Sequence, residues 1–139
     1  MPVSITLHTP KNLVCVRYSG FAEIAESMGA FEEYMRRPDY RSGRDMLVDM
    51  SKVTSHEKAS PDLIRHHALM TEIFDAFDHK PLIVFYAPTR VAQSMALVSA
   101  RPWDQLDTIS TAILEKEIDV LELLGVTEPS IERLLEKSS

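Results

Sequence analysis

The sequence is poor in cysteine, in glycine and in long apolar runs. Its single cysteine, Cys15, excludes an internal disulfide and is typical of a reducing compartment. Its four glycines form no Gly-rich phosphate loop, so a nucleotide is not the expected ligand. No apolar run approaches the roughly 20 residues of a membrane span. Met1 to Lys11 also lacks the apolar core of a secretory signal. We therefore expect a cytoplasmic protein without a membrane span.

Basic residues are outnumbered by acidic ones. The 15 lysines and arginines and 21 aspartates and glutamates give a net charge of −6. A general nucleic-acid binder needs clustered positive charge, so nucleic acid is not expected as a partner. A hydrophobic fraction of 45% over 139 residues is ordinary for one globular domain, which we place at residues 1–139. We find no pattern that predicts a cofactor or a bound metal.

A short apolar segment, residues 45–54, organises the rest of the chain. It has the length of a buried strand and not of a helix. Ser42-Gly43 before it and the polar residues 55–60 after it are typical of turns. We expect a central strand that is buried on both faces and leads into a helix.

The other segments alternate between strand and helix patterns. A hairpin with a turn at 9–12, stopped by Ser19-Gly20, precedes a helix whose apolar stripe begins at Phe21. A helix beginning at Pro61 follows the central strand, and Thr127-Glu128-Pro129 is expected to cap a final helix. The fold class is therefore α/β, with a mixed, mostly parallel sheet in the order strand, strand, helix, strand, helix, strand, helix, strand, helix, helix. The expected strands are 4–8, 13–18, 45–54, 82–86 and 109–114, and the later helices are 91–100, 117–124 and a short one that contains Ile131, Leu134 and Leu135.

Two phrases in this order are similar to a known family. Leu47-Val48-Asp49-Met50-Ser51-Lys52-Val53-Thr54 and the closing Glu117-Ile118-Asp119-Val120-Leu121-Glu122-Leu123-Leu124-Gly125 resemble the STAS domain, in its anti-sigma-factor antagonist-like branch of small bacterial proteins. The likeness runs from about Leu13 to Gly125. It implies a STAS-like fold and a non-enzymatic regulatory or protein-interaction module that docks to a protein partner.

The segment after the central strand departs from the antagonist pattern. Antagonists carry an Asp-Ser-Ser-Gly-like sequence there, and a partner kinase phosphorylates a serine in it. Here the chain reads Ser55-His56-Glu57-Lys58-Ala59-Ser60-Pro61, with no glycine after the serine. Pro61 and Asp62 favour Ser60 as a helix cap. The alternative is a phosphoacceptor at Ser60 or Ser55, where a helix amino end tolerates added negative charge.

Polar residues follow two neighbouring parallel strands and predict a crevice at their carboxyl ends. Open α/β sheets bind ligands at this edge, and helix amino ends favour anions. A second hypothesis is therefore a carrier or sensor for an anionic or lipid-like small molecule. Asp49 is the one charge inside the central strand, and we expect it at the end of the strand, accepting hydrogen bonds from loop amides. The candidate crevice residues are Asp49, Ser51, Lys52, Ser55, His56, Thr89 and Arg90.

Other polar and sulfur-bearing residues have structural interpretations. His66 and His67 are adjacent, so helical geometry directs them about 100° apart and does not favour a shared metal. His67 lies on an apolar stripe, and Cys15 is expected to be buried. The methionines suggest an adaptable protein-binding surface. They are Met28, Met35, Met50, Met70 and Met95.

No catalytic constellation stands out, so an enzyme ranks below both binding hypotheses. Phe21, Tyr34, Tyr40 and Trp103, with the Leu-rich last helices, suggest more apolar surface than one small sheet needs. We expect a homodimer that buries a helical face, because two-fold dimers are the commonest soluble assemblies.

Overall fold

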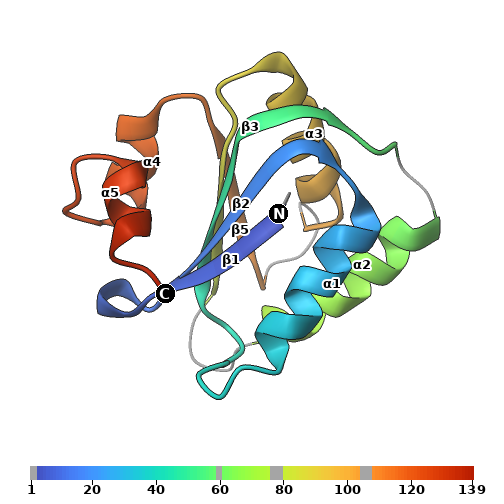
Figure 1. Cartoon of the computed structure of the whole chain (residues 1–139), viewed down its shortest axis with the longest axis horizontal. Helices are drawn as coiled ribbons and strands as arrows, with labels where there is room; N and C mark the ends of the chain where they lie inside the picture. Colours follow the sequence, from blue (N-terminus) through green and yellow to red (C-terminus); the bar gives the residue numbers. More distant parts are fainter. Residues whose placement is uncertain (1–2, 59–60, 76–79, 104–107) are drawn as a thin grey trace.

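The computed structural model describes residues 3–58, 61–75, 80–103 and 108–139. Within this part of the chain, a five-stranded sheet lies between two layers of helices, and Figure 1 shows the sheet edge-on. The strands are β1 (Val3–His8), β2 (Leu13–Ala22), β3 (Asp45–His56), β4 (Leu82–Tyr86) and β5 (Ser110–Leu114). The α-helices are α1 (Ile24–Met35), α2 (Pro61–Ile73), α3 (Arg90–Ala100), α4 (Glu117–Leu124) and α5 (Ile131–Glu136), with short 3₁₀ turns at Thr9–Lys11 and Arg101–Trp103.

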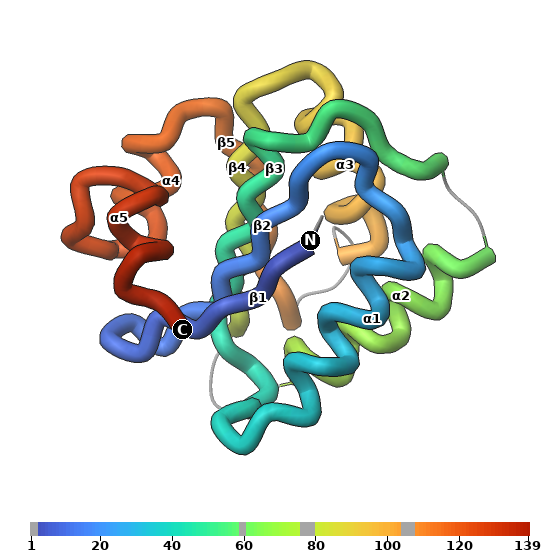
Figure 2. Tube along the Cα trace, viewed as in Figure 1, coloured from blue at the N-terminus to red at the C-terminus, as the bar shows by residue number. Residues whose placement is uncertain are grey.

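The strands lie side by side in chain order. β1 is antiparallel to β2, and the remaining neighbours are parallel, so the predicted mixed α/β sheet with an opening hairpin is confirmed. Each parallel step is made through a helix, as parallel strands require. Helices α1, α2 and α3 cover one face, whereas α4 and α5 cover the other (Figures 1 and 2). Among the described residues, no helix is both long and apolar enough to cross a membrane.

Burial of β3 on both faces divides the molecule into two cores. Met46, Val48 and Met50 belong to the larger core, under α1, α2 and α3. Leu47, one residue out of phase, belongs to the smaller core under α4 and α5. Side chains alternate between faces along a strand, so the unbroken apolar run supplies both layers. The predicted central strand is confirmed.

The end of β2 differs from the prediction. Ser19-Gly20 does not stop the strand, which continues to Ala22 through irregular register with β3. Gly20 has φ +67, a left-handed conformation that glycine adopts without a Cβ penalty, and this lets the strand bend and continue. Phe21 therefore lies in the strand, 48% exposed, and the helix begins only at Ile24.

The segment after Thr54 also differs from the prediction. Because β2 extends, β3 retains a partner: Ser55 pairs with Phe21 and His56 with Ala22. The Glu57 N–H then donates to the Ala22 carbonyl at 3.0 Å. Ser55 and His56 are therefore strand residues and not loop residues.

Two smaller corrections concern helix capping and the aromatic residues. The cap of α5 is Ser130, whose hydroxyl accepts from the Arg133 N–H at 3.1 Å, and not the segment 127–129. Tyr34 and Trp103 are only 2% and 5% exposed, because both fill the larger core. They supply no surplus apolar surface, and that part of the argument for a dimer is wrong.

We predict that Leu47→Ala lowers the free energy of unfolding by about 2–5 kcal/mol, because it leaves a cavity between β3 and the α4–α5 layer. Leu97→Ala on α3 is the control. Leu97 is 57% exposed, so its loss should change the free energy by less than about 0.5 kcal/mol. Equal effects of the two variants in denaturant melts would contradict two-sided burial of β3.

Candidate functional site

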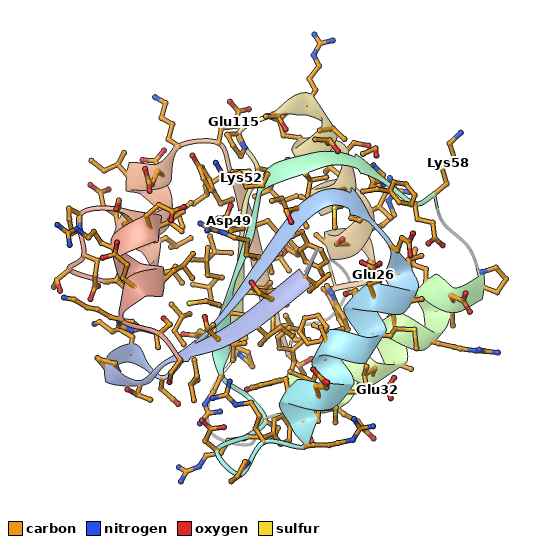
Figure 3. The ribbon with its side chains drawn as sticks, viewed as in Figure 1. Glu26, Glu32, Asp49, Lys52, Lys58 and Glu115 are labelled. Carbon is orange, nitrogen blue, oxygen red and sulfur yellow. The ribbon has the colours of Figure 1, made fainter. Side chains whose placement is uncertain are left out.

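The structure separates Asp49 from the other predicted crevice residues. Asp49 lies within β3 and is 2% exposed, on the sheet face toward α4 and α5 (Figure 3). The Arg17 Nε donates to its Oδ2 at 3.0 Å, and the Ser51 N–H donates to its Oδ1 at 2.9 Å. Arg17 also pairs with Glu132 of α5 at 2.6 Å. Asp49 thus helps to hold α5 against the sheet and is not at the strand end.

The remaining crevice candidates lie in the last part of β3 and at the start of α3. Thr89 caps α3, because its hydroxyl accepts from the Ala92 N–H at 3.2 Å. Lys52, Ser55 and Arg90 are exposed. Ser60, the predicted cap or phosphoacceptor, lies outside the described residues. His56 lines a cavity.

That cavity lies between the sheet and the layer of α1, α2 and α3. It has a volume of about 80 Å³. Most of its wall is apolar and belongs to the larger core. The lining side chains include Phe31, Met46, Val48, Met50, Leu63, Met70, Phe74, Ile83, Phe85, Met95, Val98 and Trp103.

Three polar side chains converge in this apolar wall. The Tyr18 hydroxyl is 2.6 Å from the Ser27 hydroxyl, which is 2.7 Å from the His66 Nε2. Tyr18 and Ser27 are only 6% and 4% exposed. Burial raises the pKa of Tyr18 to about 12, and burial, with a smaller contribution from His67, lowers the pKa of His66 to about 4. The chain of hydrogen bonds is therefore uncharged at neutral pH.

Each member comes from a different element. Tyr18 follows Val14 and Val16 on the inward face of β2, in the period-two pattern of a strand. Ser27 lies four residues before Phe31 on the buried side of α1. His66 of α2 meets the Phe31 ring edge-on, with centroids 5.7 Å apart. The contact with Phe31 and the hydrogen bond to Ser27 together fix the orientation of the His66 imidazole.

Polar groups at the carboxyl end of β3 tie this strand to two helices. The Glu57 carboxylate accepts from the Ile24 N–H at the start of α1, at 3.3 Å. His56 contacts Ser94 of α3 through Nε2, at 3.4 Å. These bonds give the apolar cavity a polar rim.

The arrangement suits binding better than covalent chemistry. A hydroxyl beside an imidazole at 2.7 Å has the spacing of a nucleophile and its base. Within the described residues, however, no carboxylate bonds to His66 Nδ1 to orient it as a catalytic triad requires. The described residues also hold no cluster of three or more His, Cys, Asp or Glu that would bind a metal ion.

The sequence predictions missed Tyr18 and Ser27. A usable signal was present: Ser27 is a polar residue three positions after Ile24 and four before Phe31, on the apolar stripe of a helix. The partly buried histidine was predicted at His67 alone. His67 is partly buried, as predicted, and packs edge-on against Trp103 with centroids 5.7 Å apart, whereas His66 is the member of the pair that bonds to Ser27. The methionines Met50, Met70 and Met95 line this internal cavity.

Comparison with known proteins adds no relative. No protein-family model matches the chain, and no curated protein matches it. The function is therefore argued from the geometry of the cavity.

We predict that the free energy of unfolding decreases as the pH falls from about 6.5 to 4, partly because of His66. The folded pKa is about 4 and the ordinary value is 6.5, so the unfolded state binds the proton first. At 1.36 kcal/mol per pKa unit, the loss attributable to His66 is about 3 kcal/mol and is complete below the folded pKa.

The comparison variant is His66→Gln, whose unfolding free energy should depend less steeply on pH over this range. The two proteins share every other side chain, so the difference between the two curves isolates His66. Parallel curves, or an NMR titration of His66 with its midpoint near 6.5, would contradict a buried neutral imidazole.

Proposed function

We propose that this chain is a small-molecule binding module that holds a small, mostly apolar ligand in the cavity between the sheet and helices α1, α2 and α3. The observation that carries the proposal is the uncharged chain Tyr18–Ser27–His66 in an apolar wall. Ligand sites typically combine apolar lining with a few placed polar groups that orient the ligand. The cavity fits this description better than the mostly exposed polar residues at the strand ends.

The uncharged state of Tyr18 and His66 favours a neutral group on the ligand. Tyr18 and His66 are both uncharged at pH 7, so a carboxylate would enter without a compensating cation. A hydroxyl or carbonyl can instead donate to or accept from Ser27 and His66. The proposed ligand is therefore a neutral amphiphile, which narrows the anionic or lipid-like class expected from the sequence.

The volume of the cavity in this structure limits the size of the ligand. An apolar cavity of about 150 Å³ accepts benzene, so about 80 Å³ admits only a few heavy atoms without side-chain movement. Methionine side chains are flexible and repack readily. Those of Met46, Met50, Met70 and Met95 line the space and can enlarge it for a short alkyl chain.

A regulatory module related to STAS domains is the second proposal. It is supported by the element order, with an opening hairpin, parallel crossovers and two closing helices. Exposed Ile118 and Leu123 on α4 give it a docking surface for a protein partner. The two proposals are compatible, because the cavity and the exposed side chains of α4 lie on opposite sides of the sheet, so a ligand and a protein partner would not compete for one surface.

The first proposal is tested with 1-hexanol as the probe, by ¹H–¹⁵N NMR titration. We predict shifts grouped around the cavity in the parent and their loss in Val98→Trp, because the indole fills the space. Leu97→Trp is the matched control: it adds the same side chain to the same helix, at an exposed position. Shifts scattered over the surface, or equal binding by both variants, would remove the cavity as the site.

A further inference from the structure

The outer edge of β1 is partly open. Leu7 exchanges two backbone hydrogen bonds with Ser139. The Leu7 N–H donates to the Ser139 carbonyl at 3.0 Å, and the Ser139 N–H donates to the Leu7 carbonyl at 3.1 Å. Backbone groups of an antiparallel strand point to alternate sides, so Ile5 and Val3 also direct theirs outward, whereas Ser4 bonds to β2. Within the described part of the chain, no backbone group pairs with the outward groups of Val3 and Ile5.

The edge already accepts extended backbone. An exchange of both bonds between one pair of residues is the signature of antiparallel pairing, so Ser139 adds to β1 as a strand residue would. In Figure 2 the carboxyl terminus lies against β1, which is the strand nearest the viewer. Exposed edges are usually protected by charges, prolines or bulges. The segment Val3-Ser4-Ile5 has none of these.

A groove of about 560 Å³ lies beside the open part of this edge. Its floor is formed by Val3, Ser4 and Ile5, and its wall by α1. The wall side chains are Ala30, Glu33, Tyr34, Arg36 and Arg37. The groove is separate from the cavity of the proposed function, and neither depends on the other.

We propose that the β1 edge and its groove form the interface between two copies of this chain. A two-fold axis at Ser4 relates the two copies. Val3 of each copy then lies opposite Ile5 of the other, and the two residues exchange backbone hydrogen bonds. The two sheets then continue into one. Leu7 keeps Ser139 as its partner, which ends the shared ladder.

The charges of α1 favour a second copy over an unrelated strand. A two-fold axis perpendicular to the sheet places both α1 helices on the same face, side by side and antiparallel. The groove wall carries both signs of charge, and Arg36 and Glu33 are exposed. Arg37 already bonds to Asp39 of its own chain at 2.8 Å. Antiparallel pairing brings Glu33 of one copy toward Arg36 of the other, whereas a peptide of one charge sign would meet a like charge.

The surface area that a stable interface must bury implies that the α1 helices also take part in the contact. Stable interfaces bury about 1,200–2,000 Å² in total, more than a short ladder supplies. Contact between the α1 helices across the paired grooves provides the remainder. This interface differs from the helical face expected from the sequence, because the ladder is its centre.

The test compares the oligomeric state of three proteins by analytical ultracentrifugation at micromolar concentrations. The parent should be a dimer. Ile5→Pro should be a monomer with an unchanged circular dichroism spectrum, because the lost N–H points away from β2. Thr111→Pro is the matched control on β5, the opposite edge strand. There the Ser110 N–H donates to the Pro81 carbonyl and the Leu114 carbonyl accepts from the Ala87 N–H, at the two ends of β4, so the backbone groups of Thr111 point outward. It should remain a dimer.

A cross-link provides an independent measurement should Ile5→Pro fail to fold. In the proposed register the two Ser4 residues form a non-hydrogen-bonded pair with Cα atoms about 4.5 Å apart, within disulfide reach. Ser4→Cys should therefore oxidise rapidly to a covalent dimer, since Cys15 is buried and does not compete. A monomeric parent, a folded dimeric Ile5→Pro, or Ser4→Cys that stays reduced under mild oxidant would overturn the proposal.

Discussion

Burial of β3 on both faces is the constraint on which the rest of the structure depends. One face of the strand supports three helices and the other supports two, so alternate residues of the same strand belong to the two cores. Asp49 is the exception in this apolar strand, and its buried carboxylate needs a cation. Arg17 on β2 supplies it and extends to Glu132, which couples the central strand to α5. Removing one partner of such a buried pair typically costs about 3–5 kcal/mol.

The two layers differ in the side chains that fill them. The layer under α4 and α5 is built from leucine and valine, such as Leu47 and Val84, which pack densely. The layer under α1, α2 and α3 combines methionines with aromatic rings, and these leave a cavity. Tyr18, Ser27 and His66 interrupt this apolar wall, and burial keeps Tyr18 and His66 uncharged at neutral pH. The proposed site for a neutral ligand therefore lies on the side of the sheet that faces α1, α2 and α3.

The fold was largely predictable from the sequence, whereas the site was not. Length and period locate β3 and β4, and Gly125 ends α4 in the left-handed conformation expected of it. The extension of β2 depends on pairing with β3, which a local pattern at Ser19-Gly20 cannot show. The crevice prediction assumed that residues at strand ends share one face. Asp49 points to the opposite face from the cavity, because one step along a strand reverses the side.

The cavity residues come from three elements separated in sequence. Tyr18, Ser27 and His66 each have an ordinary local interpretation, and only tertiary packing brings them within hydrogen-bond distance. A crystal structure of the protein soaked in 1-hexanol tests the central claim most directly. The account predicts the alkyl chain among the methionines of the cavity, with its hydroxyl in hydrogen-bond contact with Ser27 or His66. A cavity filled by repacked side chains, or hexanol bound only on the outer surface, would contradict it.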